Sequence, residues 1–267
     1  MVQEFAHHGC RGYMEGLGNG TVFALPPVLN YGAPALKTKI VDEVLTGKKH
    51  MALAITEAFA GSDVAGMKCR ATKSDDGKYW TVTGTKKWIT NGMFADYFTV
   101  ACKTDKGFVV LLIERQDGVD TKPIKTAYSA TAGTAFVVFD HVKVPYEHTL
   151  GTDHGGLQVV FSNFNHERWY EASISVAAQR LVVEECIKCA LSRYVNLFAS
   201  LHIRNRWATQ RQVFGKPLMH QATVRQKISQ MIARVESAQN WLENITYQMC
   251  KMGYKQQSSY LAGYEYC

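Results

Sequence analysis

Two short segments of the chain combine small, hydroxyl-bearing and aromatic residues in an order that suits a flat polar ligand. The first runs from Thr56 to Val64 (TEAFAGSDV) and the second from Lys87 to Gly92 (KWITNG). Each closes an apolar run with a turn. Gly61 permits close approach to the backbone, and the hydroxyl of Ser62 beside it can donate to an oxyanion. Together the segments predict two loops that offer backbone amides, hydroxyls and one indole to the ligand.

The elements that must position these loops change character twice along the chain. The first 47 residues are rich in glycine and proline, which predicts short helices broken by turns. From Met51 to Pro145, short β-branched and aromatic runs alternate with glycine turns, which predicts a mostly antiparallel β-barrel or sandwich. After Gly155 the apolar spacing becomes helical, and a second long helix is expected from about Gln221.

The expected fold is therefore α+β, with a helical segment, a central β-barrel or sandwich domain and an incomplete bundle of long helices. The domain boundaries that we predict are 1–49, 50–150 and 151–267.

Composition excludes some classes of protein. The 267 residues suffice for one large domain or two modest ones, and a hydrophobic content of 46% is typical of globular proteins. The formal net charge is +7, but the basic residues form no stripe interleaved with aromatics, so we expect no nucleic-acid binding. No uncharged apolar run reaches the roughly 20 residues of a membrane helix, so we expect no transmembrane segment.

The cysteines bear on compartment and metal binding. Seven cysteines at irregular spacing favour reduced thiols in an intracellular protein, with no indication of a mitochondrial, peroxisomal or cytoplasmic location. The start of the chain lacks the form of a secretory signal or transit peptide. Cys186 and Cys189 form a lone C-x-x-C without a second ligand pair, so we predict two helix thiols and no metal site.

The two loops resemble the flavin-binding loops of the acyl-CoA dehydrogenase family, and RQVFGKPL from Arg211 to Leu218 is similar to a third family motif. Each motif alone is typical of ordinary structure, so the resemblance depends on their joint order and separation. It covers the family's later N-terminal helices, its middle β-domain and the first part of its C-terminal helical domain. It implies FAD as the cofactor.

The resemblance also assigns flavin contacts. The first loop and the strand before it would line the ring and reach the pyrophosphate, while Trp88 would lie against the ring and Thr90 beside its N5 atom. The third motif would reach the flavin nucleotide of an adjacent subunit, which implies a homodimer or homotetramer. The implied cofactor-binding residues are Leu53, Ile55, Thr56, Gly61, Ser62, Trp88, Ile89, Thr90, Arg211, Phe214 and Gln221.

A catalytic base is implied at Glu167. Most family members carry the base in a late Tyr-Glu-Gly-Thr segment, and this chain ends before that segment would occur. Other members carry it on the first long helix of the C-terminal domain, where FNHER from Phe164 to Arg168 matches. Ser62, Asn165 and Arg168 are the implied substrate-binding residues. By burial statistics alone, a helix glutamate such as Glu167 is a solvated surface group.

The chain departs from the family pattern in two further places. Ala58-Phe59 stands where the family usually has Pro-Gly, and a phenylalanine forced into a glycine's positive φ would be strained. Cys189 to Arg206 looks like an insertion of about five helical turns without a family counterpart. We therefore expect a changed path for the first loop. If the insertion is helical, it would displace the third motif, and if it is looped out, the third motif could keep its place.

The resemblance implies oxidation of the Cα–Cβ bond of an acyl-CoA, by α-proton abstraction and hydride transfer to flavin N5. Electrons would pass to an external acceptor. Two alternatives stay open from the sequence. The same fold serves flavin-dependent oxidases and monooxygenases, and a chain lacking the later helices could be a catalytically inactive fragment.

Overall fold

The computed structural model describes the chain as two compact units. The larger unit comprises residues 10–170 and 254–267, and the smaller unit comprises residues 1–9 and 171–253. Arg211 and residues 192–206 of the expected insertion lie outside the described residues. The three-domain division stays a prediction. The described residues are 2–7, 11–127, 130–191, 212–217, 220–253 and 256–257.

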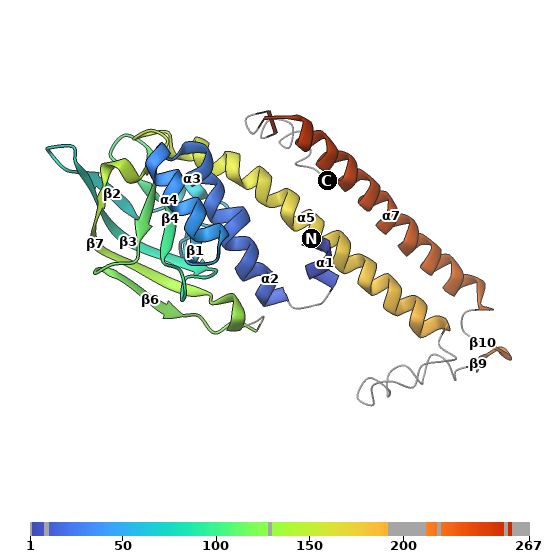
Figure 1. Ribbon diagram of the computed structural model, residues 1–267. Coiled ribbons are helices and arrows are strands. Elements are labelled where there is room, and N and C mark those ends of the chain that lie inside the picture. The colour runs from blue at the N-terminus through green and yellow to red at the C-terminus, as the bar shows by residue number, and fades with distance from the viewer. Residues whose placement is uncertain are drawn as a thin grey trace. The chain divides into compact units, whose positions relative to one another are not determined.

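The larger unit begins with short helices, as the glycine and proline content predicts (Figure 1). Pro26 and Pro27 lie in the first turn of the third of these helices, and Pro34 begins the fourth, which are positions that tolerate proline. The second is a π-helix, a form that often marks functional sites. The helices are α2 (Arg11–Gly18), η1 (Asn19–Ala24), α3 (Leu25–Tyr31) and α4 (Pro34–Leu45).

A mixed sheet follows, and all its pairings are antiparallel except β1–β4 and β2–β4. Its strands run in the order β6-β7-β3-β2-β4-β5-β8, with β1 beside β4. The strands are β1 (Met51–Ala54), β2 (Arg70–Lys73), β3 (Tyr79–Ile89), β4 (Tyr97–Lys103), β5 (Phe108–Glu114), β6 (Val119–Pro123), β7 (Ala135–Pro145) and β8 (Thr149–Leu150).

The mostly antiparallel sheet confirms the sequence prediction, but the barrel alternative is wrong because the strand order does not close. Both outer strands have features that end a sheet. β8 has two residues, and β6 carries Lys122 and Pro123 near its end. The arrangement is sandwich-like, with two hydrophobic clusters.

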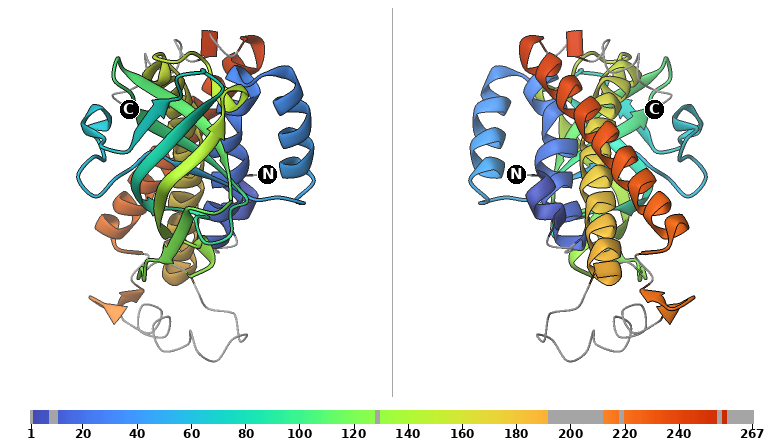
Figure 2. Two further views of the ribbon diagram at one scale, coloured as in Figure 1. Left: turned by 90° about the vertical axis from the view of Figure 1, so that its left-hand side faces the viewer. Right: turned by 90° about the vertical axis from the view of Figure 1, so that its right-hand side faces the viewer.

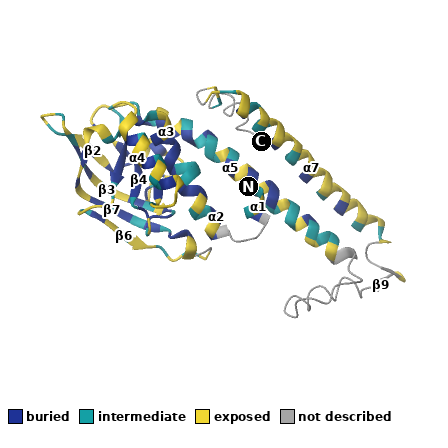
Figure 3. Ribbon diagram, in the orientation of Figure 1, coloured by how far each residue is buried: buried dark blue, intermediate teal, exposed yellow. Residues whose placement is uncertain are grey.

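The clusters lie on opposite faces of β4 and β5, whose residues alternate between them. Phe98 and Val100 face a cluster shared with β3 and β7, and Tyr97 and Ala101 face a cluster shared with α3 and α4. The start of the long helix α5 (Gly156–Leu191) joins the second cluster through Val159 and Val160. These strands are accordingly buried on both faces (Figure 3).

The smaller unit contains the second half of α5 and the predicted second long helix, α7 (Ala222–Lys251), which run side by side (Figure 2). An ion pair of 2.7 Å between Arg180 and Glu236 joins them. α7 buries one stripe at a spacing of seven residues: Ile228, Val235, Leu242 and Met249. The other elements are α1 (Val2–His7), β9 (Gln212–Val213) and β10 (Lys216–Pro217). Within the described ranges, no helix has the length and apolar character required to cross a membrane.

Candidate functional site

The first loop forms a tight turn that avoids the predicted strain. The backbone amide of Glu57 donates to the carbonyl of Ala60 at 3.0 Å, and the reverse bond is 3.4 Å. Ala58 and Phe59 lie at the tip, and neither has a positive φ. The side chain of Phe59 is 91% exposed. The loop thus follows a path that a phenylalanine tolerates, and Gly61 and Ser62 after it are exposed.

A buried ion pair connects the bases of the two loops. The fully buried Lys86 donates through Nζ to Glu57 Oε1 at 2.9 Å and to the Ile55 carbonyl at 2.8 Å. Glu57 also accepts from the backbone amides of Lys68 and Cys69, at 2.7 and 3.0 Å. Burial alone would raise the pKa of Glu57, but the Lys68 amide and the charge of Lys86 hold this pKa below its ordinary value.

A backbone bond reinforces this connection, since the amide of Lys87 donates to the carbonyl of Thr56 at 2.9 Å. Strand β3 has an irregular register between Lys86 and Ile89, and Trp88 within it has a φ of 65°. Its indole is 52% exposed. A bulky residue with positive φ is a strained conformation that persists where the surroundings fix it, often at ligand sites. Ile89, in contrast, is buried in the core of the sandwich.

Asn91 anchors the end of the second loop. Its φ is 63°, and its buried side chain donates to the carbonyls of Gly16 at 2.6 Å and Met51 at 3.1 Å. Arg115 braces the following turn by donating to the carbonyls of Gly92 at 2.7 Å and Ala95 at 2.6 Å.

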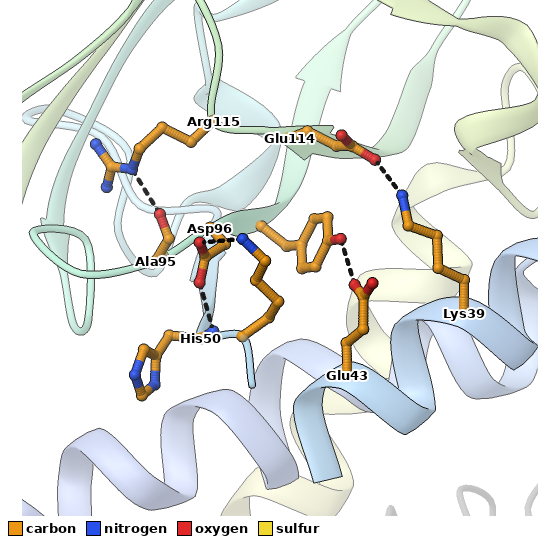
Figure 4. Close-up of polar contacts among 9 residues, drawn as sticks. Lys39, Glu43, His50, Ala95, Asp96, Glu114 and Arg115 are labelled. Carbon is orange, nitrogen blue, oxygen red and sulfur yellow. Dashed lines mark hydrogen bonds and ion pairs between the residues drawn. The ribbon is translucent and has the colours of Figure 1, made fainter. Parts of the chain in front are cut away.

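Asp96 closes the same turn (Figure 4). It accepts from the backbone amide of His50 at 2.8 Å and pairs with Lys49 at 2.9 Å. Burial alone would raise the pKa of Asp96, but the His50 amide and Lys49 lower it. The turn that follows the second loop is therefore held by Arg115 on one side and by Lys49 and His50 on the other.

The candidate base lies on the first half of α5. Glu167 is half-buried, and its Oε1 accepts from Asn163 Nδ2 at 2.5 Å. The same Nδ2 donates to the carbonyl of Phe23 in η1 at 2.8 Å. Asn165 is buried and accepts from the exposed Arg168 at 2.7 Å, so the two predicted substrate-binding residues contact each other.

Three buried asparagines, which the sequence analysis did not single out, attach these parts to α2 and η1. Asn19 accepts from the amide of Leu53 at 3.2 Å, Asn91 donates to Gly16, and Asn163 donates to Phe23. Strand β1, the second loop and the Glu167 segment of α5 therefore converge on one short helical segment. An asparagine inside an apolar run, such as FSNF around Asn163, is the sequence signal that could have found them.

The other predicted site residues divide between the two units. In the larger unit Leu53, Thr56 and Thr90 are half-buried and Ile55 is buried. Phe214 and Gln221 belong to the smaller unit, and Phe214 is 93% exposed. Across the part of the chain that the structure describes, no three His, Cys, Asp or Glu side chains gather so as to hold a metal ion.

Comparisons with known proteins decide the family. Residues 52–142 match the family model of the acyl-CoA dehydrogenase middle domain, and residues 198–263 match that of the C-terminal domain. The acyl-CoA dehydrogenase apdG of Emericella nidulans is 35% identical over 266 residues, covering 97% of this chain and 57% of that protein. The chain belongs to the acyl-CoA dehydrogenase family.

Other acyl-CoA dehydrogenases agree with this assignment. AFT10-1 of Alternaria alternata is 34% identical, over 92% of this chain and 54% of its own length. The butyryl-CoA dehydrogenase of Megasphaera elsdenii has the same fold, with a TM-score of 0.80 at 24% identity over 97% of this chain and 65% of that one. A glutaryl-CoA dehydrogenase in complex with glutaryl-CoA gives a TM-score of 0.75 at 26% identity, over 97% and 60%. The chain spans little more than half the length of the curated relatives apdG and AFT10-1.

The C-terminal match also bears on the expected insertion. It begins at residue 198, so residues 198–206 lie inside an acyl-CoA dehydrogenase domain. The prediction that the whole segment from Cys189 to Arg206 lacks a family counterpart is therefore wrong for that part.

Proposed function

We propose that this chain is part of an FAD-dependent acyl-CoA dehydrogenase that oxidises the Cα–Cβ bond of an acyl-CoA thioester. The observation that supports this most is the convergence, within one unit, of the strand before the first loop, the second loop and the Glu167 segment on α2 and η1. Flavin loops and a base must share one rigid frame, because hydride and proton leave neighbouring carbons of the same substrate.

The loops fit the cofactor that the family implies. No atom lies within 4 Å of the position that a Cβ on Gly61 would take, so a pyrophosphate can approach this backbone. Trp88 offers an exposed indole, and Thr56 and Thr90 offer half-exposed hydroxyls. Bound FAD would supply the acceptor for the β-hydrogen, as a hydride at its N5 atom.

Glu167 would take the α-proton. Its half-buried carboxylate accepts a hydrogen bond from a side chain on the same helix, which keeps one oxygen fixed. A carboxylate held in this way on a long helix suits proton abstraction better than a solvated one on a loop. Ser62, Asn165 and Arg168 are proposed to bind the substrate.

The remaining proposals concern partners and place in the cell. We propose an acyl-CoA substrate and an external electron acceptor. Arg211, Phe214 and Gln221 would reach the flavin nucleotide of a second copy, in a homodimer or homotetramer. The irregular spacing of the cysteines supports an intracellular location.

Flavin binding is tested first, by the flavin-to-protein ratio and visible spectrum of the purified chain. Thr90→Val removes one donor, and Trp88→Ala removes the exposed indole. We expect Thr90→Val to weaken flavin binding by about fivefold, corresponding to roughly 1 kcal/mol for one hydrogen bond. Unchanged flavin content and spectrum in both variants would contradict the assignment.

The role of Glu167 as the catalytic base is tested by anaerobic bleaching of the bound flavin with butyryl-CoA, isovaleryl-CoA and glutaryl-CoA. Glu167→Gln should slow bleaching by orders of magnitude and leave flavin content unchanged. Glu185→Gln is the matched control, because Glu185 lies on the same helix, is exposed and pairs only locally with Lys188 at 2.9 Å. Full-rate bleaching in Glu167→Gln would place the base elsewhere, and peroxide release in air would indicate an oxidase.

A further inference from the structure

Asn163 is the most buried polar residue of α5, with 1% of its surface exposed. Its Nδ2 group donates two hydrogen bonds, one to the Phe23 carbonyl and one to Glu167 Oε1. These two acceptors fix the amide orientation, because a flipped amide would direct its oxygen at both of them.

The bond to Phe23 has a local cause. In a regular α-helix this carbonyl would accept from the amide of residue 27, and Pro27 has no amide hydrogen. Asn163 donates to this carbonyl from α5. The bond to Phe23 fixes one hydrogen of the Asn163 Nδ2 group against η1. The other hydrogen of this group therefore has a defined direction, toward Glu167.

This arrangement leaves Asn163 Oδ1 buried without a hydrogen-bond partner among the described residues. An unsatisfied buried acceptor lowers stability, and an apolar side chain at this position would avoid that cost. The helix thus keeps a polar group at this buried position although one of its two polar atoms has no partner in the part of the chain that the structure describes. What the group provides is a fixed donor to one carboxylate.

We propose that Asn163 is a positioning residue for Glu167, a role that rests on the proposed function of Glu167 as the base. Its Nδ2 donor, held by the Phe23 carbonyl, orients the carboxylate and favours its ionised form, which is the form able to accept the α-proton. Asn163 itself does not touch the reacting atoms.

A purely structural role is the competing explanation, because Asn163 also links α5 to η1. Tyr170 provides the matched control. Its hydroxyl links the same helix to α2 by donating to the Met14 carbonyl at 3.3 Å. Tyr170→Phe removes a link of this kind without touching Glu167, while Asn163→Leu removes the donor to Glu167 and keeps a side chain of similar size.

The first experiment needs no substrate. The full chain is labelled with glutamate carrying ¹³C in its carboxyl group, and the Glu167 signal is assigned as the one that Glu167→Gln removes. We expect Asn163→Leu to raise the titration midpoint of Glu167 by about one pH unit, since a charge-assisted hydrogen bond is lost. Tyr170→Phe should leave the midpoint in place. Equal midpoints in the wild-type chain and Asn163→Leu would overturn the proposal.

The second experiment is a double-mutant cycle on flavin bleaching by butyryl-CoA, isovaleryl-CoA and glutaryl-CoA. Asn163→Leu should slow bleaching at least tenfold, and Asn163→Leu/Glu167→Gln should be no slower than Glu167→Gln alone. A structural role predicts that the two losses multiply, which would contradict the proposal. If Glu167→Gln bleaches at the full rate, the proposed base fails, while the titration still reports whether Asn163 holds the carboxylate.

A folding defect in Asn163→Leu would not block these tests. Asn163→Ala also removes the donor but leaves space that water can enter, and it replaces the leucine variant in both experiments. Equal flavin content and elution volume to the wild-type chain show that the variant is folded.

Discussion

The two candidate flavin loops are held in different ways. The second is anchored by the buried Asn91, by Arg115 and by strand β3, and it keeps a positive φ at Trp88. The first projects as a turn whose tip carries an almost fully exposed Phe59. The rest of the fold thus specifies the shape of the second loop, while the first is specified mainly at its base.

The two loops are connected to each other where they leave the sheet. The Lys86–Glu57 pair and the bond from the Lys87 amide to Thr56 connect them inside the protein. Changes at the base should therefore affect both loops and the fold. Changes toward the tip of the first loop should leave the stability of the fold nearly unchanged.

The largest expected effect follows from breaking the Lys86–Glu57 ion pair that connects the two loops. Lys86→Met leaves the buried carboxylate of Glu57 without its cation, and removal of one partner of a buried pair typically lowers the free energy of unfolding by about 3–5 kcal/mol. Urea denaturation followed by tryptophan fluorescence measures it. Lys39→Met is the control, because Lys39 pairs with Glu114 on the surface and should cost at most about 1 kcal/mol. Equal losses of unfolding free energy in the two variants would contradict the role assigned to the Lys86–Glu57 pair.

Acid should weaken the same connection. Because the pKa of Glu57 is lowered in the folded chain, its ionised form stabilises the fold fully above the unfolded value of about 4.5, and this contribution is lost as the pH falls through the lower folded value. The wild-type chain should thus lose stability below about pH 4.5 more steeply than Glu57→Gln. Thermal unfolding at a series of pH values checks this, and parallel curves would show that Glu57 does not contribute.

Two glycine substitutions separate folding from binding. A Cβ on Gly92 would lie 2.6 Å from the Ala135 Cβ and 2.9 Å from the Ile89 carbonyl, so Gly92→Ala should lower the free energy of unfolding by about 1–3 kcal/mol. Gly61→Ala meets no protein atom and should change it by less than about 0.5 kcal/mol. It should nevertheless weaken FAD binding, measured by flavin fluorescence. Unchanged binding would show that no ligand approaches this backbone.

The sequence predicted the parts of this molecule that depend on local pattern. Apolar periodicity identified the long helices and the longer strands, but β2 (RATK) and β6 (VDTKP) are short and largely exposed, and their runs carry little apolar signal. The flavin-binding role of the loop residues was predicted from the order and separation of the motifs, which resemble those of the family. The buried asparagines could not be assigned roles, because Asn91 meets Gly16 across 75 residues of sequence and Asn163 meets Phe23 across 140.

The smallest effect is expected at the tip of the first loop. Replacing Ala58-Phe59 by Pro-Gly restores the pair usual in the family, and proline suits the second position of a turn. The exposed Phe59 loses no packing in the folded chain, so the free energy of unfolding should change by less than about 0.5 kcal/mol and flavin content should stay the same. Denaturation and the flavin-to-protein ratio test both. A tenfold loss of flavin would mean that the aromatic tip itself contacts the ligand, and that the first loop is specified by its own sequence as tightly as the second is by its surroundings.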